Sequence, residues 1–236
     1  MPVSYEVQDR IALVTIENGK ANALSPEVIA GIGHAYTLAE DAGDDVGAMI
    51  LTATPGMFSG GFDLAVMRST PHAAGTLVTD GGELITRMFG GAVPVVAACP
   101  GHAIAAGALM LLGADSRIGA RGEFRIGLLE TQIGMVLPRW ASELSRERLS
   151  KRHFQQATVG ARIYDPDGAA DAGFLDAVVP ADALIEAAHA EAKHWAELPR
   201  AAYHGQVLMN RGDCLGRLAD AIAADRGRLF EVPENA

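Results

Sequence analysis

The sequence predicts an α/β fold, and two observations support this prediction. Short apolar segments rich in β-branched residues alternate with helical segments over residues 1–180. Hydrophobic residues make up 49% of the 236 residues, which is enough to build a core and argues against a disordered chain. We therefore expect one α/β core over residues 1–180, followed by a helical C-terminal region over residues 181–236.

The first expected elements are a β-hairpin and a helix. Residues 3–7 and 11–16 alternate in polarity, and Gln8-Asp9-Arg10 separates them as a turn. The helix begins at Ser25-Pro26, because serine suits the N-cap and proline the first helical position. It is expected to end near Asp41.

Strands and helices continue to alternate after this helix. Buried strands are expected at residues 46–52, 93–99 and 115–120, and a short buried helix at residues 105–112. Residues 69–80 predict a mobile loop that leads into a helix ending near Gly90-Gly91.

The pattern becomes mainly helical after Pro138. An amphipathic helix is expected at residues 140–159, a short helix at 164–171 and a last strand at 174–179. Three further helices are expected at residues 181–197, 199–210 and 213–230.

Composition narrows the possible partners. The net charge is −10 and no basic run stands out, which argues against a nucleic-acid partner. No apolar stretch approaches the roughly 18 residues of a membrane span, and residues 1–9 lack a signal-peptide pattern. Cys99 and Cys214 form no metal-ligand pattern, so we expect two reduced thiols in a cytoplasmic protein.

Two turns of small residues are candidates for binding an oxygen atom. Gly60-Gly61-Phe62-Asp63 lies between a strand and a helix start, and Ala105-Ala106-Gly107 follows a strand and a turn. Taken alone, each turn could have a purely structural role. The first could be a glycine turn in which Asp63 is the N-cap of a helix, and the small residues of the second could only allow close packing. Together, two strand-to-helix turns of one sheet can aim two N–H donors at one point, which is an oxyanion hole.

Glu130 is the candidate acid or base. It stands among the apolar residues Ile126, Leu128, Leu129, Ile133 and Met135. Apolar surroundings raise the pKa of a carboxyl group towards the working pH, although Glu130 could also be a solvated helix or loop residue. A carboxylate near an oxyanion hole can remove a proton α to a thioester carbonyl, and the hole then holds the enolate.

Other catalytic patterns have less support. His72 and His102 suggest a nucleophilic triad, but no serine stands in a Gly-x-Ser-x-Gly turn, and we expect His102 to line a turn. The chain has no Walker motif, and Gly56 to Gly61 lacks the spacing of a dinucleotide-binding fingerprint.

At these segments the sequence resembles the crotonase superfamily, which contains the enoyl-CoA hydratases and isomerases. The resemblance covers nearly the whole chain and rests on several motifs in the right order, which span residues 19–24, 58–64, 100–115 and 173–180. It implies a crotonase-like superhelix of ββα units with a C-terminal helical trimerisation region. A homotrimer or a dimer of trimers is therefore expected.

The resemblance also implies roles for individual residues. The backbone N–H groups of Phe62 and Ala106 would hold the thioester oxygen of an acyl-CoA, and Glu130 would be the acid/base. The residues implied to bind the CoA part of the substrate are Ala21, Ala23, Leu24, Gly60, Asp63 and Leu64. No separate cofactor and no metal are implied.

Two further regions are assigned by the same resemblance. The lysine that commonly follows the first oxyanion loop is Ala65 here, so Lys20 or Arg68 would bind the CoA phosphates. Residues 68–90 are expected to border the tunnel for the acyl chain.

The departures from the family decide the expected reaction. Enoyl-CoA hydratases carry one glutamate three residues beyond the second oxyanion donor and another downstream. Here the first position is Leu109 and only the second glutamate, Glu130, is present. Hydration needs an activated water and a delivered proton, whereas a single base can move a proton from C2 to C4.

Residues 126–134 resemble the same segment of Δ3,Δ2-enoyl-CoA isomerases, although Leu129 replaces the asparagine usual beside the glutamate. Those isomerases also have an apolar residue at the position of Leu109. We therefore predict that the protein converts a 3-enoyl-CoA to a 2-enoyl-CoA. The alternatives are an enoyl-CoA hydratase, another reaction through a thioester enolate, and an acyl-CoA-binding protein without activity.

Overall fold

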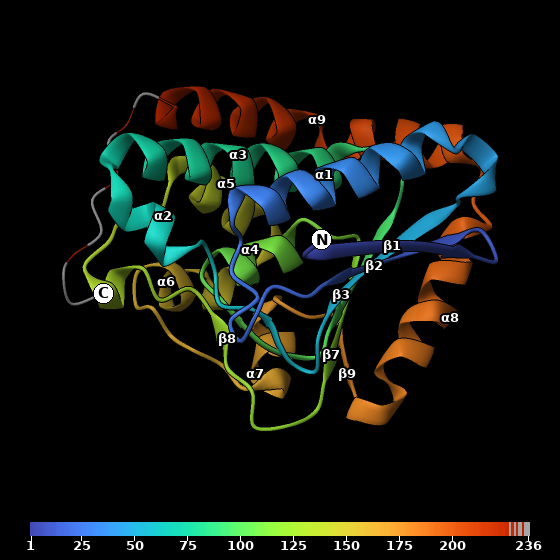
Figure 1. Cartoon of the computed structure of the whole chain (residues 1–236), viewed down its shortest axis with the longest axis horizontal. Coiled ribbons are helices and arrows are strands. Elements are labelled where there is room, and N and C mark those ends of the chain that lie inside the picture. Colours follow the sequence, from blue (N-terminus) through green and yellow to red (C-terminus); the bar gives the residue numbers. More distant parts are fainter. Residues whose placement is uncertain (227, 229, 231–232, 234–236) are drawn as a thin grey trace.

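The computed structural model describes residues 1–226, 228, 230 and 233, and it shows an α/β fold with two sheets (Figure 1). The larger sheet contains, in spatial order, β1 (Val3–Gln8), β2 (Ile11–Ile16), β3 (Ala48–Ala53), β5 (Val95–Cys99), β7 (Ser116–Ala120) and β9 (Ala177–Val179). Its first pair is antiparallel and its other pairs are parallel. The smaller sheet is parallel and contains β4 (Gly56–Ser59), β6 (Gly101–Ile104) and β8 (Ile126–Gly127).

The two sheets are joined by a repeated ββα arrangement. β3 leads into β4, β5 into β6 and β7 into β8, so that each short strand follows a strand of the larger sheet. The helices that follow are α2 (Leu64–Ser69) with α3 (Pro71–Gly90), then α4 (Ala106–Leu112), then α5 (Arg139–Arg148). Because β4 and β6 are parallel neighbours, the turns after these two strands lie at the same edge of the smaller sheet.

Helices cover both faces of the larger sheet (Figure 1). On one face, α8 (Leu184–Ala196) packs through Ala188 and Ala192 against apolar residues such as Ile50 and Val96. On the other face lie α1 (Pro26–Asp41), α3 and α4, and α9 (Arg200–Asp225) runs over α3 and α5. The remaining α-helices among the described residues are α6 (Lys151–Thr158) and α7 (Pro166–Ala172).

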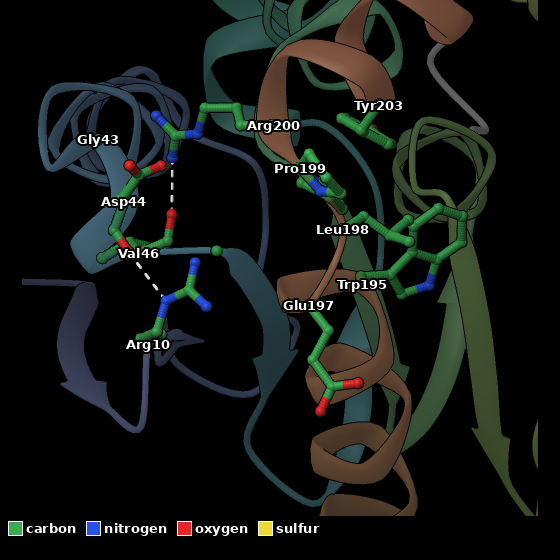
Figure 2. A pocket seen from close by; sticks show the side chains of 12 residues that line it. Arg10, Gly43, Asp44, Val46, Trp195, Glu197, Leu198, Pro199, Arg200 and Tyr203 are labelled. Atoms are coloured by element: carbon green, nitrogen blue, oxygen red, sulfur yellow. Dashed lines mark hydrogen bonds between the residues drawn. The ribbon is translucent and has the colours of Figure 1, made fainter.

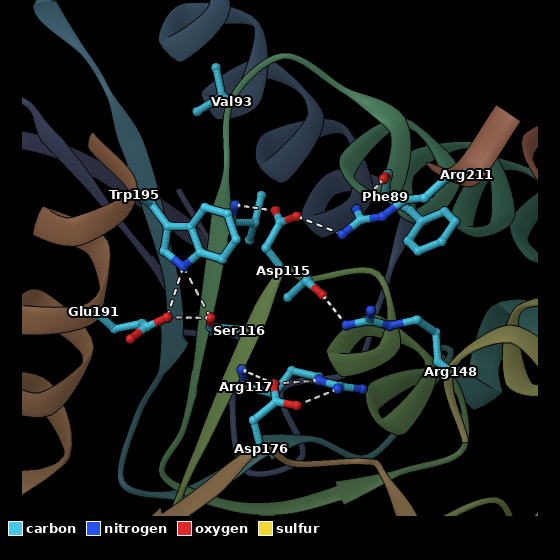
Figure 3. Close-up of polar contacts among 12 residues, drawn as sticks. Phe89, Val93, Asp115, Ser116, Arg117, Arg148, Asp176, Glu191, Trp195 and Arg211 are labelled. Atoms are coloured by element: carbon cyan, nitrogen blue, oxygen red, sulfur yellow. Dashed lines mark hydrogen bonds and ion pairs between the residues drawn. The ribbon is translucent and has the colours of Figure 1, made fainter. Parts of the chain in front are cut away.

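A buried ion pair attaches α9 to this core (Figure 3). The Asp115 side chain, which is fully buried just before β7, accepts hydrogen bonds from Arg211 of α9 at 2.9 Å and from the Val95 backbone N–H at 2.8 Å. Arg211 also donates to the Phe89 carbonyl oxygen at 2.6 Å and lies over the Phe89 ring. The ion pair thus links α9 to β5, β7 and the end of α3.

The α/β class, the hairpin, the helix at α1 and the strands of the larger sheet agree with the sequence prediction, with small shifts at their ends. The prediction of a loop at residues 69–80 is wrong. This segment is helical, because the Thr70 hydroxyl accepts a hydrogen bond from the Ala73 N–H and Pro71 is the first residue of α3. The helix predicted at residues 140–159 is two helices, since Leu149 and Ser150, with ψ angles of 148° and 131°, are not helical.

The last predicted helices also differ from the structure. The helices expected at residues 199–210 and 213–230 form one continuous helix, α9, which ends at Asp225. Residues 228 and 230 lie beyond that end and are not helical, while residues 227 and 229 are outside the described part of the chain. Cys99 and Cys214 are both buried and unpaired. None of the helices in the described ranges is long and apolar enough to cross a membrane.

Candidate active site

The turns that follow β4 and β6 are in close contact. Gly61 has a φ of +103°, and a Cβ atom at this position would lie 3.1 Å from Ala105 Cβ and 3.5 Å from the Ala106 nitrogen. A Cβ atom at Gly107 would lie only 2.3 Å from the Ser59 carbonyl oxygen. Glycine at these two positions therefore allows the two turns to approach each other.

The N–H groups of Phe62 and Ala106 have no hydrogen-bond acceptor among the residues that the structure describes. Ala106 is the first residue of α4, where N–H groups lack partners within the helix and carry a partial positive charge. Other N–H groups of the first turn are already used: those of Gly60, Gly61 and Asp63 donate to Ala21 O (2.8 Å), Ser59 Oγ (3.2 Å) and Leu24 O (3.2 Å). The two N–H groups without an acceptor lie in the two turns that meet.

Ala105 holds the second turn in a strained conformation. Its φ of 52° and ψ of −123° are rarely adopted by residues other than glycine, at a cost of about 1–3 kcal/mol. The turn is fixed from both sides, because the Ala105 N–H donates to Gly127 O at 2.9 Å and the Ala105 carbonyl accepts from Leu109 N–H at 3.1 Å. This strained residue directly precedes Ala106.

A cavity of about 330 Å³ opens beside these turns. Four of the residues predicted for catalysis or CoA binding, Gly60, Phe62, Leu64 and Glu130, line the cavity together with Leu109. Most of the other lining side chains are apolar, and within the described part of the chain Glu130 is the one ionisable residue on the wall. The cavity therefore joins one carboxyl group to the first of the two turns in apolar surroundings.

Glu130 lies at the start of a short 3₁₀ helix (Thr131–Ile133), after β8. The residue is only 9% exposed, and its Oε2 atom has no hydrogen-bond partner among the described residues. Burial away from water raises the pKa of Glu130 to about 7. Near neutral pH this carboxyl group can therefore both accept and return a proton.

Leu109 occupies the position where a second acid is expected in a hydratase. It lies one helical turn beyond Ala106 on α4, it is 1% exposed, and its side chain lines the cavity. The wall is therefore apolar at this point.

The other predicted CoA contacts lie around the first turn. The Asp63 carboxylate caps α2 by accepting hydrogen bonds from the N–H groups of Ala65 (2.8 Å) and Val66 (3.2 Å). The Leu24 side chain is fully buried in the core, and Ala21 is exposed.

The remaining residues predicted to contact CoA are partly or fully exposed to solvent. Ala23 is half-buried and its carbonyl accepts from Asn18 Nδ2 at 2.8 Å, while Lys20 and Arg68 are exposed. The binding of CoA by any of these residues stays a prediction.

The two histidines are not among the described residues that line the cavity. His102 lies on β6, where its Nδ1 atom accepts a hydrogen bond from the Arg125 N–H at 2.9 Å and its ring packs edge-on against Phe124. His72 is exposed in the first turn of α3. Neither is placed to activate a nucleophile in the cavity.

Four residues of the wall were not expected from the sequence. Val78 belongs to the segment expected to border the acyl tunnel, but Met67 on α2, Val136, Pro138 and Phe230 beyond α9 were not expected there. Nothing local in the sequence marks Phe230, because the residue reaches the wall only through the packing of α9.

A second cavity, of about 140 Å³, lies at the start of α9 (Figure 2). Its wall includes Tyr203 and two arginines that support the backbone: Arg200 donates to Val46 O at 2.7 Å, and Arg10 to Asp44 O at 2.9 Å. None of the residues predicted for catalysis or for CoA binding lines this cavity.

The chain is similar to known proteins over most of its length. The model of the family described as enoyl-CoA hydratase/isomerase matches residues 6–229. An enoyl-CoA hydratase/isomerase family protein from Pseudomonas syringae has a similar structure, with a TM-score of 0.93, 43% identity, and coverage of 97% of this chain and 98% of that one.

Two further relatives are described as isomerases. A Mycobacterium tuberculosis protein is described as an enoyl-CoA isomerase in one solved structure and as a probable enoyl-CoA hydratase in another. The first of these structures has a TM-score of 0.89 and 36% identity, covering 95% of this chain and 97% of that one. Human mitochondrial enoyl-CoA delta isomerase 1 is 29% identical over 218 residues, which make up 91% of this chain and 72% of the human protein.

Proposed function

The chain belongs to the enoyl-CoA hydratase/isomerase family, and we propose that it moves the double bond of a 3-enoyl-CoA to give a 2-enoyl-CoA. The observation that carries this proposal is the wall of the cavity. It presents one buried carboxyl group, Glu130, whose Oε2 atom has no hydrogen-bond partner in the described chain, and it has Leu109 where hydration would need a second acid.

The proposed reaction uses three groups of the protein. The thioester oxygen accepts hydrogen bonds from the N–H groups of Phe62 and Ala106, which stabilise the negative charge that develops there. The Glu130 carboxylate takes a proton from C2 of the substrate, so that the C2–H bond breaks and an enolate forms. Glu130 then returns the proton to C4 while the double bond settles between C2 and C3, and no water is consumed.

The state of Glu130 supports this role. A carboxyl with a pKa of about 7 is present in both its ionised and its protonated form near neutral pH, as a group that accepts a proton and returns it must be. The apolar wall also favours the transfer of one proton between two carbons over the addition of water, because Leu109 offers no hydrogen bond to a water molecule. Two relatives that are described as isomerases support this proposal.

The experiment that tests the proposal compares two substrates with the unmodified protein. We expect 3-hexenoyl-CoA to be converted to the conjugated 2-hexenoyl-CoA, and hydration of 2-hexenoyl-CoA to be at least 100-fold slower. Faster hydration than isomerisation would reject the proposal in favour of a hydratase. Binding of hexanoyl-CoA without turnover of either substrate would instead show an acyl-CoA-binding protein.

A further inference from the structure

The cavity at Glu130 is closed in part by a residue from the end of the chain. Phe230 follows α9, yet its side chain is only 5% exposed and lines the same cavity as Glu130 and Phe62. An aromatic side chain buries a large apolar area when it leaves water, so Phe230 stabilises this arrangement.

The described residues around Phe230 have defined packing. The Arg228 carbonyl oxygen lies 2.9 Å, and Phe230 Cδ2 3.9 Å, from the point where Gly75 of α3 would carry a Cβ atom. The Arg228 guanidinium lies over the Phe230 ring at 5.0 Å from its centre. Pro233 Cγ is 3.3 Å from the corresponding point at Gly134, close to Glu130 in the chain.

Two contacts with α3 give an approximate distance between the Phe62 and Phe230 rings along the cavity. The Phe62 ring packs against Gly81, where a Cβ atom would lie 2.4 Å from Phe62 Cε1, and Phe230 packs against Gly75. These two glycines are six positions apart on α3, which corresponds to about 9 Å along the helix axis. The turn that would hold the thioester and the Phe230 ring therefore lie at different points along the cavity.

From this placement we propose that Phe230 determines substrate specificity by forming the far wall of the acyl cavity, which limits the length of the acyl chain. The inference rests on the proposed function, since it takes the cavity to be the acyl site. A volume of about 330 Å³ is near the low end of the roughly 300–1,000 Å³ range of ligand pockets. The substrate class is thus a short or medium acyl chain on CoA.

Binding of saturated acyl-CoA tests the inference without any need for catalysis, because a saturated chain has no double bond to move. Each additional methylene that becomes buried should tighten binding about fourfold. We expect this gain to stop, in a series from butanoyl-CoA to hexadecanoyl-CoA measured by calorimetry, at the length where the chain reaches Phe230.

Two variants should move that limit in opposite directions. In Phe230→Ala the increase in affinity with each added methylene should continue to longer acyl chains. The affinity for dodecanoyl-CoA relative to hexanoyl-CoA should therefore rise at least tenfold. In Phe230→Trp the gain should stop earlier. Phe124→Ala is the matched control, since this half-buried ring packs on His102 and is not on the cavity wall, and its limit should stay unchanged.

The inference would be overturned if the chain length at which affinity stops increasing were unchanged in both Phe230 variants. It would also be overturned if this length changed by the same amount in Phe124→Ala. A failure of the proposed function gives a different result. In that case the limit exists and moves in the variants, but the unmodified protein does not isomerise 3-hexenoyl-CoA. A variant that fails to fold is identified by thermal unfolding, and the other Phe230 variant then decides the outcome.

Discussion

Glu130 is a buried carboxyl group that has a pKa of about 7 because burial disfavours its charged form. The proposed reaction begins with the ionised form, since this form accepts the proton from C2. We therefore expect kcat/KM for 3-hexenoyl-CoA to rise with pH and to level off above an apparent pKa near 7, as measured from initial rates between pH 5 and 9. A profile that is flat over this range, or that titrates near 4.5, would contradict the assignment.

The same pKa has a consequence for stability that does not depend on activity. The folded protein retains the proton of Glu130 up to about pH 7, whereas the unfolded chain releases it near 4.5. The contribution of this group to the free energy of unfolding is therefore fully present below pH 4.5 and is lost as the pH rises through 7. The loss is on the order of 3 kcal/mol. Urea unfolding should show that the free energy of unfolding of Glu130→Gln lacks this decrease with pH.

At the scale of the elements, α9 supplies a cap that α5 lacks. The residue before α5 is Pro138, which provides no side-chain cap. The fully buried Asp225, the last residue of α9, accepts hydrogen bonds through Oδ2 from the N–H groups of Arg139 (2.6 Å) and Trp140 (3.4 Å). These are the first two residues of α5, so the end of one helix caps the beginning of another.

Loss of this cap should destabilise the protein. We expect Asp225→Ala to lower the free energy of unfolding by about 1–2 kcal/mol, because N–H groups of the first turn of α5 would lose their acceptor. Urea unfolding measures the change. Asp220→Ala, at an exposed position of the same helix, is the control and should change stability by less than about 0.5 kcal/mol. Equal effects of the two substitutions would contradict this role of Asp225.

The elements that the sequence predicts correctly are those with a strong local signal. The alternation in β1 and β2 and the Ser25-Pro26 helix start are of this kind. Thr70-Pro71 carries the same signal as Ser25-Pro26, so the sequence does mark the start of α3 within the segment predicted as a loop. The strands β4, β6 and β8 were not predictable, because they are two to four residues long and are defined by pairing with one another.

At the scale of the whole molecule, the candidate site is assembled from segments that are far apart in the sequence. Glu130, Phe62 and Ala106 were proposed from motifs, and the parallel pairing of β4 with β6 explains how two of them come together. Phe230 could not be found in this way, since its place depends on how α9 packs over α3 and α5. The trimeric assembly and the separate C-terminal region stay predictions.

The central claim is that Glu130 alone moves the proton, and the Glu130→Gln variant tests it most directly. Turnover of 3-hexenoyl-CoA should fall about 10³-fold, as expected for loss of a general base, while the Kd for hexanoyl-CoA changes less than about threefold. Glu123→Gln, at an exposed position between β7 and β8, should retain full activity. A Glu130→Gln variant that keeps more than a tenth of the turnover would contradict the claim.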